Sequence, residues 1–262
     1  MDLQLNGKVA VVTGGSKGIG LAITRAMVAE GVRVVAGARS EGPDLAELAS
    51  AGNVHPVAVD LTAPDGPARL IDEAVRAFGG IDILVNNVGA AQVRLDGFLA
   101  VTDEDWANSL SVNFLSAVRT IRAALPHLLE RTPATIVTVS SVNAFLPDPV
   151  VIDYSAAKAA LSNLCKSLSK EFGPRGLRVN MVSPGPVETA LWLAEGGVAD
   201  TVARATGSAP SEVAKHAVAD SATGRFTHPE EVADAVLLLA SGRAGNITGA
   251  DLVIDGGLIQ TL

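Results

Sequence analysis

The sequence predicts a doubly wound α/β fold in which seven parallel strands carry helices on both faces. Short β-branched runs recur along the chain, and amphipathic segments long enough to be helices separate most of them. A strand, a crossover helix and a second strand form the unit of a parallel sheet, and right-handed crossovers place helices on each face. We therefore expect a Rossmann-type sheet with its active site at the carboxyl ends of the strands.

The seven expected strands are short apolar runs in chain order. They are 8–13 (KVAVVT), 32–38 (VRVVAGA), 55–60 (HPVAVD), 82–87 (DILVNN), 135–140 (TIVTVS), 178–183 (RVNMVS) and 252–255 (LVID). Apolar periodicity predicts helices between them, among them 103–129 and 154–172. With 48% hydrophobic and 18% charged residues, the 262-residue chain fits one domain over residues 1–262.

Charge and hydropathy argue against several classes of function. A net charge of -8 opposes general nucleic-acid binding, which needs a basic surface. Apolar runs such as 135–139 are far shorter than the roughly 20 residues of a membrane span. The start, MDLQLNGKVAVV, has no basic region or cleavage site, so we expect a cytoplasmic protein. The single cysteine, Cys165, lies in a helical apolar pattern that predicts a packed thiol, and we expect no metal.

One long stretch, 184–228, interrupts the alternation of strands and helices. It contains many small and polar residues, with helical character around 191–193 and 211–218. A long insertion before the last helix is more often a lid than a second domain. We expect a substrate lid at about 189–222, with a solvated surface excursion as the alternative.

A glycine-rich turn joins the first strand to the first helical pattern. Gly14, Gly18 and Gly20 stand in a G-x-x-x-G-x-G spacing, which differs from the commonest dinucleotide pattern. Glycine lets the backbone turn tightly and approach a pyrophosphate, which the amides of the following helix then hold. The turn therefore predicts a dinucleotide site, although a purely structural glycine turn is the alternative for this motif alone.

Proton-transfer chemistry is suggested by Tyr154, the only tyrosine, and by Lys158, which follows four residues later in a helical pattern. This spacing puts both side chains on one helical face. A phenol has a pKa of about 10, and a nearby positive charge favours its ionised form. Ser140 and Ser141 end a predicted strand, where a hydroxyl can hold a substrate oxygen. Taken alone, the Tyr154–Lys158 spacing has chance as its alternative. The alternative for the serine pair is a simple helix cap or turn.

Taken together, these motifs resemble those of the short-chain dehydrogenase/reductase family, of the short single-domain kind. The resemblance spans essentially the whole chain in register. It rests on TGGSKGIG at 13–20, Asp60, NNVG at 86–89, Asn113, Ser141, YSAAK at 154–158 and PGPVET at 184–189. Val88 departs from the alanine that is usual in the family.

The resemblance implies a catalytic tetrad of Asn113, Ser141, Tyr154 and Lys158. In this interpretation Tyr154 is the acid and base, and Ser141 polarises the substrate oxygen. Lys158 binds the nicotinamide ribose and lowers the pKa of Tyr154, while Asn113 fixes a water that relays protons. Ser141 is preferred to Ser140 because it stands thirteen residues before Tyr154, as in the family pattern.

The same resemblance implies where a nicotinamide dinucleotide is bound. Asp60 is assigned to the adenine, the turn at 86–89 supports the cofactor, and Val187 with Thr189 contacts the carboxamide and phosphates. The full predicted set is Gly14, Ser16, Lys17, Gly18, Ile19, Gly20, Arg39, Ser40, Asp60, Leu61, Asn87, Gly89, Tyr154, Lys158, Pro184, Gly185, Val187 and Thr189.

The end of the second strand predicts a preference for NADP(H), with NAD(H) as the alternative. Ala38 occupies the position of the acidic residue that would repel a 2′-phosphate. Arg39 then offers a fork of donors suited to a phosphate, and Lys17 in the glycine turn adds a second charge. The alternative is that both are ordinary solvated cations.

The predicted activity is hydride transfer between the nicotinamide and a carbonyl or secondary alcohol of a small molecule. The alternatives are a 3-oxoacyl-(acyl-carrier-protein) reductase, for which Arg131 and Arg175 would form a basic docking rim, and a non-catalytic dinucleotide-binding sensor.

Apolar pocket walls are predicted in three segments: 141–153, 90–98 and the lid. The predicted substrate contacts are Ser141, Phe145, Leu146 and Trp192, although Trp192 has a packing role as its alternative. We expect a homotetramer from the resemblance, and because helices 103–129 and 154–172 carry apolar residues on more than one face.

Overall fold

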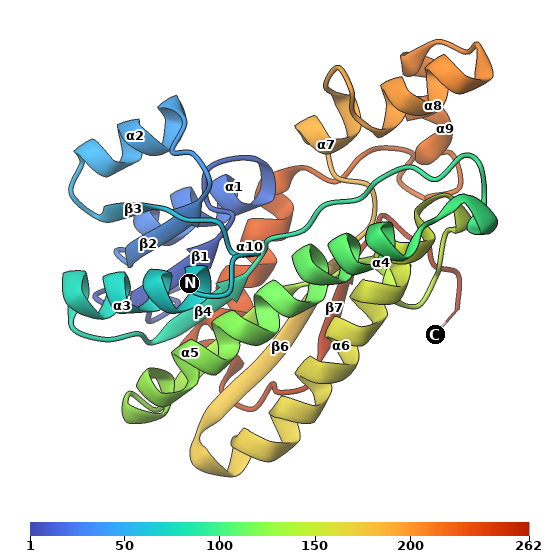
Figure 1. The fold of residues 1–262 in the computed structure, drawn as a ribbon. Helices are drawn as coiled ribbons and strands as arrows, with labels where there is room; N and C mark the ends of the chain where they lie inside the picture. Colours follow the sequence, from blue (N-terminus) through green and yellow to red (C-terminus); the bar gives the residue numbers. More distant parts are fainter. Residues whose placement is uncertain (262) are drawn as a thin grey trace.

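The computed structural model describes residues 1–261, which form a seven-stranded parallel sheet with helices on both faces (Figure 1). The strand order is β3-β2-β1-β4-β5-β6-β7, so the predicted fold class and all seven strands are confirmed. The strands are β1 Val9–Thr13, β2 Arg33–Ala38, β3 Val54–Ala58, β4 Ile83–Asn86, β5 Ala134–Val139, β6 Leu177–Pro184 and β7 Asp251–Ile254.

Helices connect successive strands and cover the sheet in two layers. They are α1 Gly18–Ala29, α2 Pro43–Ser50, α3 Gly66–Phe78, α4 Asp103–Leu110, α5 Ser116–Glu130, α6 Ile152–Phe172, α7 Ala190–Leu193, α8 Val198–Thr206, α9 Pro210–Ala217 and α10 Pro229–Ala240. Side chains of α1 and α10 pack with one face of the sheet, and those of α3, α5 and α6 pack with the other.

The central strands are buried on both faces because the helical layers cover both. In β1, Ala10 and Val12 join the core on the α1 side, whereas Val11 joins the core on the α6 side. All three are fully buried, as expected for a central parallel strand. The chain adds β2 and β3 on one side of β1 and β4 to β7 on the other. The chain therefore reverses its direction of winding between β1 and β4, and folds of this kind bind ligands at the carboxyl ends of such strands.

The segment predicted as one helix over 103–129 is interrupted by a π-helical turn, Ser111–Leu115. Asn113 lies within this turn, and its Nδ2 donates to the carbonyl oxygens of Ser109 and Ala90 at 3.0 and 2.9 Å. A side chain that bonds to nearby backbone competes with the regular helical ladder, and π turns of this kind are frequent at functional sites. Apolar periodicity alone does not reveal such a turn.

The stretch 184–228 is more ordered than its composition predicted. Helices α7 and α9 match the two helical patches, but α8 was not expected. Gly207, with φ +71°, ends α8, and Asp200 pairs with Arg204 one turn later at 2.8 Å. Figure 1 shows these three helices as an orange group set apart from the sheet layers.

At the amino edge of the sheet, where β6 begins, Arg178 caps the C-terminal end of α10. Its guanidinium donates to the carbonyl oxygens of Leu239 and Ser241 at 2.8 and 3.0 Å. These bonds satisfy carbonyl groups that a helix end leaves without partners. Over residues 1–261, no helix has both the length and the apolar character required to cross a membrane.

Candidate active site

Close backbone approach explains why glycines occupy the turn between β1 and α1. Gly14 and Gly18 have φ values of +68° and +53°, a region that favours glycine. A Cβ at Gly20 would overlap the carbonyl oxygen of Gly14, and one at Gly14 would lie 3.0 Å from Nδ2 of Asn87. The turn is therefore built from glycine for steric reasons.

The positive end of α1 opens at this turn. The helix begins at Gly18, its N-cap residue Lys17 forms no side-chain capping bond, and no acidic residue stands in its first turn. Free amides and the helix dipole favour a bound anion at such an end. Ser16 and Ile19 are half-buried beside it. These features fit the pyrophosphate of a dinucleotide.

The NNVG turn is fastened to the glycine turn by hydrogen bonds. The Thr13 hydroxyl accepts from the backbone amides of Asn87 and Val88 at 2.8 and 3.2 Å. In return, Nδ2 of Asn87 donates to the Thr13 carbonyl at 3.0 Å. Thr13 therefore sets the distance between two turns that the sequence analysis assigned to the cofactor, although it was not itself selected there.

Polar and charged residues follow β2 and β3 at the same edge. Ala38 ends β2, and Arg39 and Ser40 after it are exposed, as is Lys17. The carboxylate of Asp60 accepts from the amide and hydroxyl of Thr62, and these bonds lower its pKa, with a smaller contribution from the Arg39 charge. Leu61, in contrast, is buried in the core beneath α3.

Tyr154 and Lys158 lie one turn apart on α6, and the Lys158 ammonium sits 5.6 Å from the centre of the phenol ring. Lys158 is only 2% exposed, and its Nζ donates to the carbonyl oxygen of Val139 at 2.9 Å. Burial lowers the pKa of Lys158 to about 8. Both side chains therefore lie on one face of α6, as predicted.

Burial also dominates the pKa of Tyr154, which is raised above its ordinary value of 10.0. A hydrogen bond with the Ser141 hydroxyl opposes this rise. The resemblance implied that Lys158 lowers the pKa of Tyr154, whereas burial and the Ser141 hydrogen bond are the causes that act in this structure. The phenol therefore stays protonated at neutral pH.

The two serines after β5 have different surroundings. The Ser140 hydroxyl is 2.7 Å from the Ser162 hydroxyl, within the interior. The Ser141 hydroxyl faces Tyr154 and also accepts from the amide of Asn143 at 3.2 Å, which caps the turn Val142–Ala144. Ser141 thus combines the expected position near the phenol with the capping role that was its alternative.

Asn113 is buried and bound on both sides to the backbone of Ala90, whose amide donates to Oδ1 at 2.9 Å. Gly89 lies between this side chain and Lys158. A Cβ at Gly89 would be 3.2 Å from Asn113 Oδ1 and 3.3 Å from Lys158 Nζ. The structure therefore brings all four residues of the predicted tetrad to the carboxyl edge of the central strands.

The PGPVET segment leads from β6 back to the glycine turn. Pro184 ends β6, and the Gly185 amide donates to the carbonyl oxygen of Ile254 at 2.9 Å. Val187 is buried and pairs with Thr227 in an isolated parallel bridge. A Cβ at Gly18 would lie 3.4 Å from Thr189, so this residue sits directly beside the start of α1.

The predicted pocket walls are apolar and exposed at this edge. Phe145 and Leu146 are 47% and 46% exposed, and Leu191 and Leu193 of α7 are similarly open. Trp192 is half-buried against Phe226, in an edge-to-face contact with ring centres 5.7 Å apart. Its packing role, proposed as an alternative, is therefore present in the structure.

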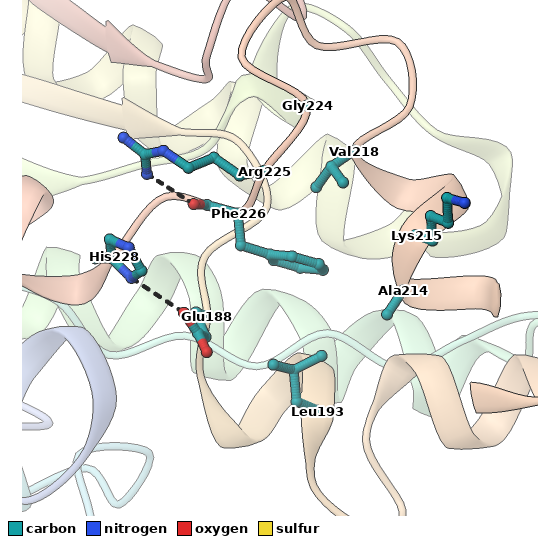
Figure 2. Close-up of a pocket in the computed structure, with 9 residues that line it drawn as sticks. All are labelled: Glu188, Leu193, Ala214, Lys215, Val218, Gly224, Arg225, Phe226 and His228. Carbon is teal, nitrogen blue, oxygen red and sulfur yellow. Dashed lines mark hydrogen bonds and ion pairs between the residues drawn. The ribbon is translucent and has the colours of Figure 1, made fainter. Parts of the chain in front are cut away.

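A cavity of about 290 Å³ lies under α7 and α9, and Figure 2 shows its lining. It is lined by Glu188, Leu193, Ala214, Lys215, Val218, Gly224, Arg225, Phe226 and His228. Two of the lining residues contact each other, since His228 Nδ1 lies 3.0 Å from Glu188 Oε2. None of the predicted tetrad lines it, so this cavity is separate from the site around Tyr154.

Cys165 lies in the interior, and its Sγ is 3.4 Å from the Thr138 hydroxyl. Burial raises the pKa of the thiol to about 11. Such a thiol is packed and unreactive at neutral pH, as expected. Across residues 1–261 no cluster of three or more histidine, cysteine, aspartate or glutamate side chains is placed to hold a metal ion.

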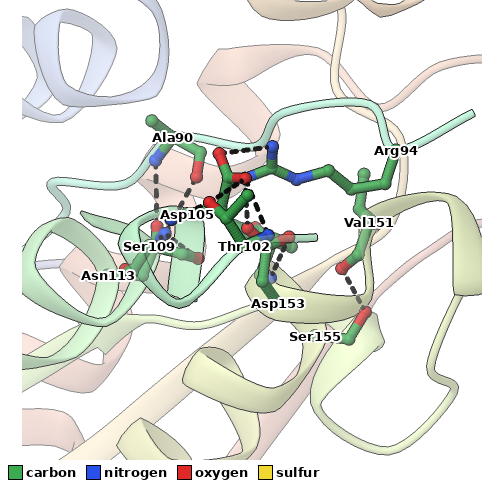
Figure 3. Close-up of polar contacts among 10 residues, drawn as sticks. Ala90, Arg94, Thr102, Asp105, Ser109, Asn113, Val151, Asp153 and Ser155 are labelled. Carbon is green, nitrogen blue, oxygen red and sulfur yellow. Dashed lines mark hydrogen bonds and ion pairs between the residues drawn. The ribbon is translucent and has the colours of Figure 1, made fainter. Parts of the chain in front are cut away.

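One charged group at the start of α6 was not predicted from the sequence. Arg94, in the coil after β4, binds Asp105 of α4 and Asp153 of α6 (Figure 3). Two signals pointed to it: Asp153 directly precedes Tyr154, and Thr102 with Asp105 forms a capping-box pattern at the start of α4. Neither signal reveals that one arginine joins the two carboxylates.

Comparisons with known proteins agree with this geometry. A family model described as enoyl-(acyl carrier protein) reductase matches residues 14–259. The 3-alpha-(or 20-beta)-hydroxysteroid dehydrogenase of Mycobacterium tuberculosis (strain ATCC 25618 / H37Rv) is 36% identical, covering 100% of this chain and 93% of that protein. The 3-oxoacyl-(acyl-carrier-protein) reductase FabG of Thermotoga maritima is 32% identical, covering 98% and 100%.

Among solved structures, L-sorbose reductase from Gluconobacter frateurii, complexed with NADPH and L-sorbose, superposes with a TM-score of 0.90. It is 32% identical over 100% of both chains. The chain therefore belongs to the short-chain dehydrogenase/reductase family, whose members bind a nicotinamide dinucleotide and act on CH–OH or C=O groups. The substrates named for these three relatives differ, so the family leaves the substrate of this chain open.

Proposed function

We propose that this oxidoreductase reduces apolar ketones, or oxidises the matching secondary alcohols, with a preference for NADP(H). The observation that carries the proposal is the convergence of Ser141, Tyr154 and Lys158 at one end of the sheet. When bound, the nicotinamide dinucleotide supplies or accepts the hydride. The protein residues then have to hold the substrate oxygen and move one proton.

The roles of the side chains follow from their surroundings. A phenol that burial keeps protonated is suited to donate its proton to a substrate oxygen during reduction. The Ser141 hydroxyl, beside the phenol, can donate a hydrogen bond to the same oxygen. Lys158 provides a positive charge next to the ring and is assigned to the nicotinamide ribose. Asn113 is assigned to the proton relay, and its bonds to Ala90 fix its amide next to Gly89.

The NADP(H) preference rests on charge at the end of β2. Arg39 is exposed there and Lys17 is exposed at the start of α1, so both cations are open to solvent. Ala38 leaves no carboxylate at the strand end to repel a phosphate. Asp60 lies close enough to Arg39 for the arginine charge to lower the pKa of the Asp60 carboxyl. That carboxylate, however, already accepts hydrogen bonds from Thr62.

An apolar substrate is favoured by the side chains exposed around the site. They come from three segments and are Leu95, Phe98, Leu99, Phe145, Leu146, Leu191 and Leu193. The one arginine among residues 90–98, Arg94, is held by two carboxylates. This composition supports an apolar ring or chain beside the carbonyl better than a polyol, which needs many hydrogen-bonding groups.

The acyl-carrier-protein alternative loses the support that the sequence analysis gave it. Arg131 follows α5 and Arg175 precedes β6, so both lie at the amino edge of the sheet. Arg131 donates to the Gly79 carbonyl at 2.6 Å. The prediction that these two arginines form a rim at the site mouth is therefore wrong.

We also propose that residues 189–222 act as a lid and that the protein is a homotetramer. The Glu188–His228 contact and the Val187–Thr227 bridge join the residues that flank both ends of the segment, and this arrangement supports a lid hinged at those two points. Most large apolar side chains of α5 and α6 are half-buried rather than exposed. Apart from those around the site, four exposed apolar side chains lie in or near β7 and α10, namely Leu238, Ile247, Leu252 and Val253, and they support an interface at that edge.

A panel of carbonyl compounds tests the proposed function. Trans-1-decalone, ethyl acetoacetate and L-sorbose are supplied with NADPH or NADH, and nicotinamide absorbance is followed. We expect turnover with decalone and NADPH, and its loss in Tyr154→Phe with dinucleotide binding kept within a few fold. Sorbose as the best substrate would contradict the apolar assignment, and an active Tyr154→Phe protein would contradict the role of the phenol.

A further inference from the structure

Arg94 joins the first turns of two helices. Its Nη1 donates to Asp105 Oδ1 of α4 at 2.8 Å, and its Nη2 donates to Asp153 Oδ2 of α6 at 2.6 Å (Figure 3). The arginine side chain is only 14% exposed. The bonds to Asp153 and Asp105 raise the pKa of Arg94, so it stays charged despite its burial.

The two carboxylates differ in how much they need this partner. Asp105 is partly open and already caps α4 with Thr102, whose hydroxyl and amide donate to Oδ2 at 2.7 and 3.0 Å. Asp153 is 1% exposed and has far less access to water. A buried carboxylate is costly without a charge partner. Asp153 therefore depends on the Arg94 charge more than Asp105 does.

This bridge reaches the backbone on both sides of the α6 start. Oδ1 of Asp153 accepts from the amide of Tyr154 at 3.0 Å. The Arg94 amide donates to the carbonyl oxygen of Val150 at 2.7 Å, in the turn just before α6. Arg94 thus contacts the chain four residues and one residue before Tyr154. Any shift of Arg94 would move the point from which the phenol projects.

We propose that Arg94 is a positioning residue, which holds the phenol of Tyr154 in place by fixing the start of α6 against α4. The proposal rests on the proposed function, since it takes Tyr154 as the proton donor. Both Nη groups are occupied by carboxylates, and Nε is buried with no hydrogen-bond partner within residues 1–261. Arg94 therefore acts through Asp153 and not on the substrate.

The single tyrosine allows a test that does not depend on turnover. In protein grown with ring-¹³C-tyrosine, Tyr154 gives the only tyrosine signal in the NMR spectrum. We expect Arg94→Met to shift or broaden this signal, and Asp105→Asn, which keeps the Asp153 pair, to change it much less. Arg178→Met is the matched control, because it removes another arginine of low exposure from the opposite edge of the sheet.

Kinetics with trans-1-decalone and NADPH provide the second measurement. A displacement of about 1 Å costs about a hundredfold in rate, so Arg94→Met should lower kcat by about that factor, with dinucleotide affinity unchanged. Arg94→Lys keeps the charge but cannot hold both carboxylates, and should lose about tenfold, because a point charge lacks the guanidinium fork.

Two results would overturn the proposal. One is a Tyr154 signal that Arg94→Met leaves in place, and the other is an equal fall of kcat in Arg178→Met, which would indicate general destabilisation. Absence of turnover in the unmodified protein would count against the proposed function alone, because the NMR comparison tests Arg94 without it.

Discussion

Lys158→Met should stabilise the protein while it abolishes turnover. The Lys158 ammonium is 2% exposed, and burial lowers its pKa from 10.5 to about 8. At about 1.4 kcal/mol per pKa unit, this difference corresponds to about 3 kcal/mol of destabilisation at neutral pH. Methionine removes that cost but leaves the Val139 carbonyl without its 2.9 Å donor, which costs about 1 kcal/mol. We expect a net gain of about 2 kcal/mol in the free energy of unfolding.

The pH dependence gives this prediction a second measurement. A lysine whose folded pKa is depressed binds its proton more weakly in the folded state. Between pH 8 and 10.5 the unfolded chain therefore holds more protons, and stability rises with pH. Urea unfolding at pH 7 and pH 9.5 should show this rise in the unmodified protein and less of it in Lys158→Met. A variant less stable at pH 7, or two parallel pH profiles, would refute the argument.

Three further predictions concern the edges of the site. Gly89→Ala should lower turnover at least tenfold with little loss of stability, since its Cβ would press within 3.4 Å of both Asn113 and Lys158; unchanged kcat would contradict this geometry. Arg39→Ala should raise the Michaelis constant for NADPH by about ten to a hundredfold and leave that for NADH nearly unchanged, whereas Ala38→Asp should reverse the preference; equal efficiency with both cofactors in the unmodified protein would end the assignment. Amide hydrogen exchange over 189–222 should slow when NADPH and decalone bind, and Phe226→Ala should speed it in the free protein, because the Trp192 contact is lost; identical protection in all states would rule out a lid.

Features that repeat along the chain were predictable from sequence. Apolar runs and glycine spacing reflect local backbone requirements, so the strands, the turn at Gly14 and the shared face of Tyr154 and Lys158 followed directly. The family resemblance then supplied the order in which these motifs meet, including Asn113, whose position in a π turn no periodicity reveals.

Features that depend on pairing across the fold were not predictable. Arg94 is five residues after the NNVG turn and far along the chain from Asp153, and only packing brings the charges together. The effect of burial on the pKa of Tyr154 was missed for the same reason, since burial is a property of the packed site. Arg131 and Arg175 do not form a docking rim because both lie in connections at the amino edge of the sheet, and their residue type alone does not reveal this edge.

The contact between Trp192 and Phe226 makes Trp192 an intrinsic fluorescent probe of the 189–222 segment. Trp192 lies in α7, and the other tryptophan, Trp106, is in α4. Replacing Trp106 with phenylalanine would leave a single indole, whose emission depends on how dry its surroundings are. Opening of the 189–222 segment would separate that indole from the Phe226 ring and expose it to water. Stopped-flow fluorescence could then time the motion of this segment within one turnover, without any added dye.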